Sequence, residues 1–135
     1  MASKQRRCWR HGVDEDPPYP TISAILAGPK KQRRVRKAIE VDTGFSGTIA
    51  VDEKTVEELQ LPVIGEITVN TATQRGTPVQ LRLVKISIPE LRIRQEPLAA
   101  LTATKCLLGR KMMMDRRWLL DNRANEFCLL KHEGS

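Results

Sequence analysis

The chain consists of short apolar runs that glycine and proline repeatedly interrupt. Eight glycines and eight prolines are spread through its 135 residues. Short runs bounded by such residues are typical of β-strands joined by tight turns. No run approaches the roughly 20 apolar residues that a membrane-spanning helix needs, and no secretory signal follows the charged N-terminus. The sequence therefore predicts one mostly β domain with no membrane partner.

Alternation of apolar and polar residues locates the expected strands. They cover residues 21–27, 33–41, 48–51, 64–70, 78–88, 91–94, 118–120 and 126–130, whereas residues 97–103 are ambiguous. A short mid-chain helix is expected over residues 53–60, with Asp52 as its N-cap, and a C-terminal helix over residues 110–117. Residues 1–19 mix charges with glycine and proline and predict a flexible arm. The folded domain then covers residues 20–132.

One turn stands out chemically. Ile39 and Val41, both β-formers, lead directly into Asp42, Thr43 and Gly44. A carboxylate at the end of a buried strand is costly unless its charge is used. Thr43 adds a hydroxyl, and Gly44 lets the backbone turn sharply. Asp42 is therefore the candidate catalytic residue in an active-site turn. The alternative is an ordinary turn in which Asp42 only caps the backbone.

A second pattern lies further along the chain, where Leu107, Leu108 and Gly109 precede Arg110. Residues 42–47 read Asp-Thr-Gly-Phe-Ser-Gly, and we call them the acid turn. This turn, followed later by an apolar–apolar–Gly run, resembles the retroviral-type aspartic peptidases. The match is fullest with the prokaryotic variant that carries this hexapeptide. The resemblance spans roughly residues 20–131, and the joint occurrence of both motifs in order is what makes it specific.

The resemblance implies an all-β, single-lobed acid-protease barrel with a flap hairpin, and an endopeptidase that cleaves peptide or protein substrates as a homodimer. Two neighbouring carboxylates cannot both ionise, so the two copies of Asp42 would share one proton. The ionised one would activate a water molecule, and the protonated one would polarise the scissile carbonyl. Thr43 would brace the acid turns across the dimer axis, and Gly44 would flank the substrate. No cofactor or metal is implied.

The same resemblance assigns further roles. A flap over the substrate would comprise Ala72, Thr73, Gln74, Arg75 and Gly76, and support beneath the acid turn would come from Leu107, Leu108 and Gly109. The final strand, near residues 127–130, would pair between subunits. Ser46 occupies the position of an acid that pairs with the arginine of the apolar–Gly–Arg segment in retroviral enzymes. Asp52 is the alternative partner for Arg110.

The cysteines bear on the cellular compartment. Cys8, Cys106 and Cys128 are an odd number without a framework spacing, which favours a reducing, cytoplasmic location over a disulfide scaffold. Cys106 and Cys128 are expected to be buried apolar residues. Cys8 with His11, and Cys128 with His132, have spacings that suit zinc. Since the two chain ends would have to meet, no metal site is expected.

Positive charge supports a rival interpretation. The formal net charge is +7, and the excess is concentrated in residues 4–10 and 30–37. Such runs usually form a solvated surface. They would also suit a non-catalytic basic β-domain of the same fold that binds nucleic acid or another anionic partner.

Overall fold

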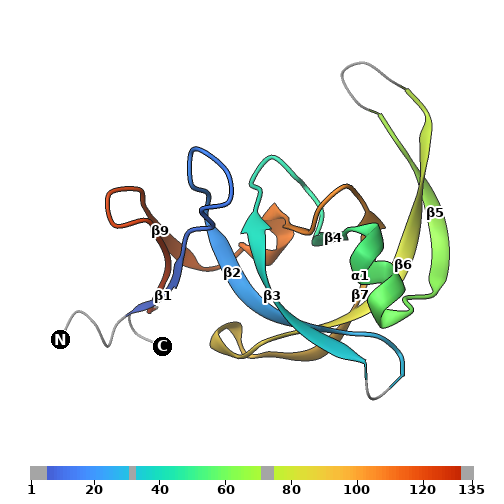
Figure 1. Ribbon diagram of the computed structural model, residues 1–135, viewed down its shortest axis with the longest axis horizontal. Coiled ribbons are helices and arrows are strands. Elements are labelled where there is room, and N and C mark those ends of the chain that lie inside the picture. The colour runs from blue at the N-terminus through green and yellow to red at the C-terminus, as the bar shows by residue number, and fades with distance from the viewer. Residues whose placement is uncertain (1–5, 31–32, 71–74, 132–135) are drawn as a thin grey trace.

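The computed structural model describes residues 6–30, 33–70 and 75–131 of the chain. Seven strands form its larger sheet: β2 (Thr21–Ala27), β3 (Arg34–Val41), β4 (Ile49–Val51), β5 (Val63–Val69), β6 (Thr77–Ile88), β7 (Ile93–Thr102) and β8 (Leu107–Leu108). They run in the order β2-β3-β8-β4-β7-β6-β5, and an extra pairing of β2 with β6 closes six of them into a barrel. The β5 strand extends from the barrel beside β6 (Figure 1). The predicted mostly β fold is confirmed.

The barrel interior is filled by aliphatic side chains from alternating strand positions. Ile22, Leu26, Ile39, Ile86 and Leu108 are each fully buried at 0% exposure. Residues that alternate along a strand point to the same face, which explains why the polar residues between them remain nearer to solvent. Burying each such side chain contributes roughly 1.5–3 kcal/mol. The core therefore depends on branched aliphatic residues.

The predicted mid-chain helix is confirmed as α1 (Glu53–Leu59). Asp52 caps it, because its carboxylate accepts a hydrogen bond from the Thr55 N–H at 2.9 Å. Leu59 is 1% exposed and fixes the helix to the barrel. Gln60 ends the helix in a left-handed conformation with φ 52°.

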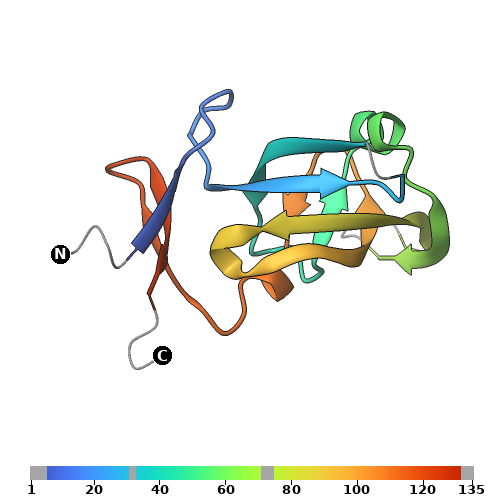
Figure 2. The same cartoon turned by 90° about the horizontal axis from the view of Figure 1, so that it is seen from below.

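A second, three-stranded sheet lies beside the barrel (Figure 2). It contains β1 (Arg6–Arg10), β9 (Arg117–Asp121) and β10 (Glu126–Leu130) in the order β1-β10-β9, and we call it the terminal sheet. Trp118 stacks on Phe127 with ring centroids 5.0 Å apart. Phe127 is 7% exposed and belongs to the same apolar cluster as the barrel core. The terminal sheet is thus packed onto the domain.

The terminal sheet corrects three expectations. Residues 6–10 form a strand, although the sequence predicted a flexible arm over residues 1–19. Cys8 and Cys128 face each other on β1 and β10 and form a disulfide, whereas none was expected. The β10 strand is central, with β1 on one edge and β9 on the other, so it has no free edge for pairing between subunits.

The predicted helix over residues 110–117 is wrong. Only η3, a 3₁₀ turn over Arg110–Met112, forms there. Asp115 has a φ of 63°, which an α-helix cannot accommodate. The Trp118 indole N–H donates to the Met113 carbonyl at 2.9 Å and holds the chain in this turn. Upstream, Leu91 ends another 3₁₀ turn, η2 (Pro89–Leu91), so β7 begins at Ile93 and not at residue 91 as predicted. The β7 strand continues to Thr102 and so includes most of residues 97–103, which the sequence left ambiguous.

Candidate active site

The acid turn connects two strands that do not pair with each other. The β8 strand lies between them, parallel to β3 and antiparallel to β4. Leu108 is paired with Val41 on one side and with Ile49 on the other. Residues far apart in the sequence are thereby brought directly beside the acid turn.

Backbone hydrogen bonds hold the acid turn against the segment that follows β8. The Asp42 N–H donates to the Leu108 carbonyl at 2.9 Å, which fixes the start of the turn. The Arg110 N–H donates to the Phe45 carbonyl at 2.8 Å, and the Gly109 N–H donates at 2.9 Å to the carbonyl of Thr48, directly after the turn. Each such bond contributes about 1 kcal/mol. The turn that carries Asp42 is therefore set by its neighbours on both sides.

Gly109 allows this close approach. A Cβ atom at Gly109 would lie 2.1 Å from the Gly47 carbonyl oxygen and 2.8 Å from the Phe45 carbonyl oxygen. Both contacts are with backbone, which cannot move aside as a flexible side chain would. A side chain at position 109 is thus incompatible with this geometry.

The carboxylate of Asp42 lies at the end of β3 and is partly exposed. One of its oxygens accepts a hydrogen bond from the Gly44 N–H at 2.9 Å, which orients the group. Thr43 and Gly44 are both exposed. The structure therefore places all three predicted active-site residues at an accessible edge, next to Leu107, Leu108 and Gly109.

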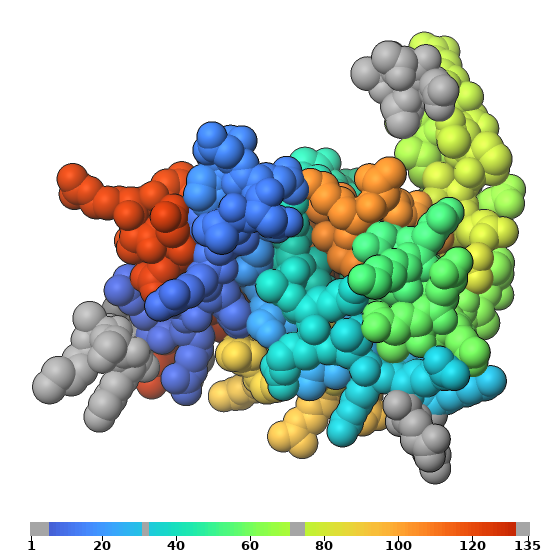
Figure 3. All heavy atoms as spheres, in the orientation of Figure 1, coloured from blue at the N-terminus to red at the C-terminus, as the bar shows by residue number. Residues whose placement is uncertain are grey.

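The β5–β6 hairpin corresponds to the predicted flap. It stands clear of the body, and a concave space opens between it and the segments near residues 45 and 105, drawn in teal and orange (Figure 3). Ala72, Thr73 and Gln74 lie outside the described residues. Arg75 is exposed, and Gly76 has a φ of +72°, with its N–H donating to the Asn70 side chain at 2.9 Å. Gly76 therefore occupies a left-handed position that suits glycine.

One face of this hairpin is apolar. Ile67 pairs with Val79, and Leu81 lies opposite Gly65, so these side chains share a face. Ile67 is 39% exposed, and Val79 and Leu81 are half-buried. The hairpin thus offers apolar surface beyond the barrel.

Asp52 does not pair with Arg110. Its carboxylate instead caps α1 and accepts a hydrogen bond from the Cys106 thiol, with sulfur and oxygen 3.7 Å apart. Burial raises the pKa of Asp52, but hydrogen bonds from Thr55, the charge of Lys37 and the hydrogen bond from the Cys106 thiol together outweigh that effect and leave its pKa below the usual value. The Arg110 side chain is exposed, and its segment is held by its backbone N–H.

Polar contacts that the sequence did not predict hold the connection between β1 and β2 in place. The Tyr19 hydroxyl donates to Asp14, and this hydrogen bond, with burial and the Asp14 charge, raises the pKa of Tyr19 to about 12. Lys105 lies 2.8 Å from Glu40 and 3.6 Å from Glu15. Lys105 thereby links this connection to β3 next to the acid turn.

Comparisons with family models, curated proteins and solved structures find no match to this chain. Within the described residues, no helix has the length and apolar character that crossing a membrane requires.

Proposed function

We propose that the chain is an aspartic endopeptidase that works as a homodimer, with one Asp42 from each copy. The supporting observation is the acid turn itself. It is inserted between β3 and β4, fixed by β8, and approached by Gly109 so closely that only glycine fits. A turn that serves only to reverse the chain does not require such support from a distant segment.

The chemistry requires a second carboxylate. The sequence contains a single Asp-Thr-Gly, so the partner acid comes from another copy across a two-fold axis. Two carboxylates held a few ångströms apart share one proton. The ionised Asp42 takes a proton from water as it attacks the peptide carbonyl, and the protonated Asp42 donates to the carbonyl oxygen. Neither a metal nor a covalent intermediate is needed.

The β5–β6 hairpin suits the role of a cover for an extended peptide. Its apolar face, formed by Ile67, Val79 and Leu81, would contact side chains of the substrate. Closure of such a hairpin would exclude water from the reacting carbonyl. The proposed substrate is therefore a peptide or protein segment in extended conformation.

We propose a cytoplasmic location from the odd number of cysteines in the sequence, although the expectation that they form no disulfide is contradicted by the bond between Cys8 and Cys128. A cytoplasmic thiol pool would keep Cys8 and Cys128 reduced, in contrast to the disulfide of the structure. The active-site geometry does not depend on this bond, because the acid turn is fixed by β8 and residues 109–110.

Cleavage of peptide mixtures by the purified protein tests the proposal. Asp42→Asn should abolish cleavage while retaining the fold. Asp115→Asn is the matched control, because it removes an exposed carboxylate in a left-handed position that asparagine tolerates. Cleavage that persists in the Asp42 variant would refute the proposed mechanism.

Mixing wild-type protein with Asp42→Asn tests the shared site. If each active site needs Asp42 from both copies, an equal mixture at fixed total concentration should keep about a quarter of the activity. Retention of about half would mean that each chain works alone.

The rival function is binding of nucleic acid by a basic surface. Arg34 and Arg36 are exposed at alternate positions of β3 and so lie on one face. Such binding would weaken steeply with salt. Salt-sensitive binding that Asp42→Asn leaves unchanged, in a protein without cleavage activity, would favour this function.

A further inference from the structure

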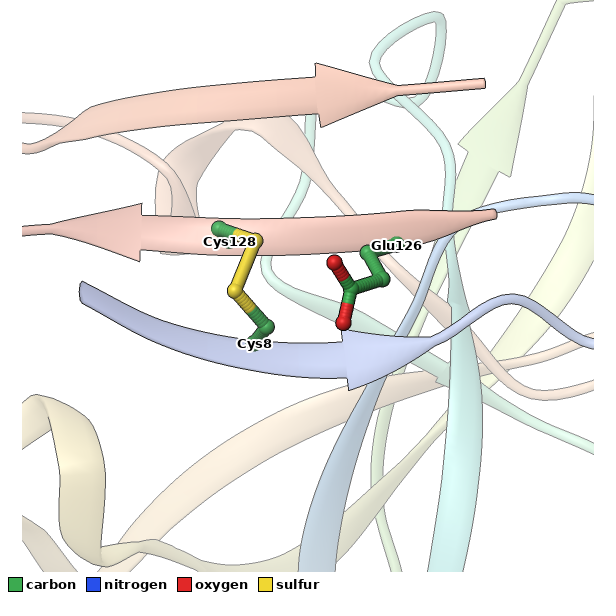
Figure 4. Close-up of side chains that lie close together, drawn as sticks. All are labelled: Cys8, Glu126 and Cys128. Carbon is green, nitrogen blue, oxygen red and sulfur yellow. A yellow bond between two sulfur atoms is a disulfide. The ribbon is translucent and has the colours of Figure 1, made fainter. Parts of the chain in front are cut away.

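Three metal-ligating side chains meet in the terminal sheet, away from the acid turn. Within the described residues, the sulfur atoms of Cys8 and Cys128 and a carboxylate oxygen of Glu126 lie within 4.8 Å of one another. Figure 4 shows the Glu126 carboxylate beside the disulfide, between β1 and β10. The proposed peptidase chemistry uses none of these groups.

The backbone fixes this arrangement independently of the disulfide. Cys8 is paired with Cys128 in the β1–β10 ladder, and the neighbouring pair on the same face joins Arg10 to Glu126. Opposed residues of an antiparallel pair keep their Cβ atoms about 4.5–5.5 Å apart. The two thiols would therefore remain neighbours after reduction as long as the strands stay paired.

We propose that, once reduced, Cys8 and Cys128 bind a thiophilic divalent cation such as Zn²⁺ together with Glu126, with water as the fourth ligand. Reduction requires a thiol or phosphine reductant. A dithiol, for example, is oxidised to its own disulfide and transfers two electrons and two protons to the cysteine pair. The cation then replaces both thiol protons, which pass to solvent.

The dimensions fit tetrahedral zinc. With Zn–S bonds of about 2.3 Å, the two sulfur atoms need to lie about 3.8 Å apart, which cysteines on opposed strand positions can reach by rotating their side chains. Cys8 is exposed and provides a route of entry, whereas Cys128 is 0% exposed and anchors the site. Two thiolates and one carboxylate carry three negative charges, one more than the divalent cation neutralises. Arg6 and Arg10 lie on the same face of β1 as Cys8, where their positive charges would offset the excess.

The ligand set differs from the one that the sequence spacing suggested. His11 is 5% exposed, and its Nε2 atom lies 3.1 Å from the Asn122 side-chain oxygen. It is not part of the cluster with Cys8 and Cys128. His132 lies outside the described residues. The obstacle seen in the sequence, that the two chain ends would have to meet, does not apply, because β1 and β10 are paired.

Cobalt titration of the full chain tests the proposal. The reduced protein under anaerobic conditions should bind one Co²⁺ with thiolate-to-metal charge-transfer absorption, and Zn²⁺ should displace it. The oxidised protein should show no such absorption. Glu126→Gln should weaken cobalt binding by about tenfold or more. Cys106→Ser, which alters a cysteine outside the cluster, should leave the absorption unchanged.

A second readout needs no substitution. Zn²⁺ should protect the exposed Cys8 of the reduced wild-type protein from alkylation, with Cys106 as the internal reference in the same peptide map. Absence of cobalt absorption in the reduced protein, or equal alkylation of Cys8 with and without Zn²⁺, would overturn the proposal and leave a structural disulfide only. Equal cobalt absorption in oxidised and reduced protein would overturn it as well, because the metal would then lie elsewhere.

Discussion

Gly109→Ala should destabilise the protein through the acid turn. The new methyl group would lie 2.1 Å from the Gly47 carbonyl oxygen, so the acid turn or residue 109 would have to move by about 1.3 Å or more to reach an ordinary contact distance. Forcing extra atoms into such a contact costs about 1–3 kcal/mol. The same movement would weaken the bonds to the Thr48 and Phe45 carbonyls, at about 1 kcal/mol each.

The expected loss is therefore about 3–5 kcal/mol of unfolding free energy. With a urea m-value of about 2 kcal/mol/M, the unfolding midpoint should fall by about 1.5–2.5 M with little change in slope. Gly65→Ala is the matched control, because its new methyl group would meet only the Leu81 Cδ1 atom at 3.7 Å. Its stability should stay within about 0.5 kcal/mol of wild type. Equal midpoints for Gly109→Ala and wild type would refute the close-contact argument.

Three further predictions concern polar and covalent contacts. Tyr19 is the single tyrosine, so phenolate absorbance should report its pKa of about 12 directly, and Asp14→Asn should return the pKa towards 10.0. Because the folded-state pKa is raised, the stability from this contact is fully present below pH 10 and is lost as pH rises towards 12, which unfolding curves across that range can check. Asp52→Ala should cost about 1 kcal/mol at neutral pH through loss of the helix cap. Since the folded-state pKa of Asp52 is lowered, the difference in unfolding free energy between variant and wild type should shrink as pH falls below 3.8. Chemical denaturation across this pH range measures the difference, and a difference independent of pH would contradict the prediction. Reduction of the bond between Cys8 and Cys128, 120 residues apart in sequence, should lower the free energy of unfolding by about 4–5 kcal/mol in a denaturant titration, and no change would contradict a closed disulfide.

Most barrel strands could be predicted because their alternation is local. In β2, Ile22, Ala24 and Leu26 alternate with less buried neighbours, and the observed strand covers the predicted range. The cap of α1 was also readable, since Asp52 directly precedes a polar run with apolar residues at helical spacing. Such features depend on residues within one element.

The errors lie where contacts between residues, and not the pattern within one segment, decide the structure. The β1 strand contains three arginines and little alternation, and it forms because β10 pairs with it and Trp9 packs on the core. Pairing of cysteines cannot be deduced from spacing alone. The methionines favour a helix by propensity, but Met112 is buried while Met114 is 59% exposed, and the bond from Trp118 to Met113 selects a turn.

In the candidate site, too, the residues could be predicted from local motifs, whereas their arrangement could not. Asp42, Thr43 and Gly44 could be selected from one short motif, and Gly109 from a second. That β8 lies between β3 and β4 is a property of the sheet, which no single segment encodes. The consequence for Gly109, a backbone contact that excludes a side chain, therefore became visible only in three dimensions.

The terminal sheet would also constrain how the proposed dimer forms. The resemblance to retroviral-type peptidases implied pairing between subunits through the final strand, but β10 has β1 and β9 on its two edges. Freeing an edge towards β1 would break a ladder of five residue pairs and the disulfide. The acid turn belongs to the barrel, so the proposed meeting of two copies of Asp42 does not itself require β1 to leave β10.

We therefore predict that dimerisation does not require reduction of the disulfide. Sedimentation equilibrium of oxidised and reduced protein should give dimer dissociation constants within about threefold, since both forms keep β1 on β10 and the difference is below 1 kcal/mol. Cys106→Ser serves as a control against disulfides between chains, because Cys106 is the free cysteine among the described residues. A dimer that forms only after reduction would show that β1 must leave β10 first. In that case the dimer interface would be the exchanged strand edge, and the disulfide would block assembly of the two-aspartate site.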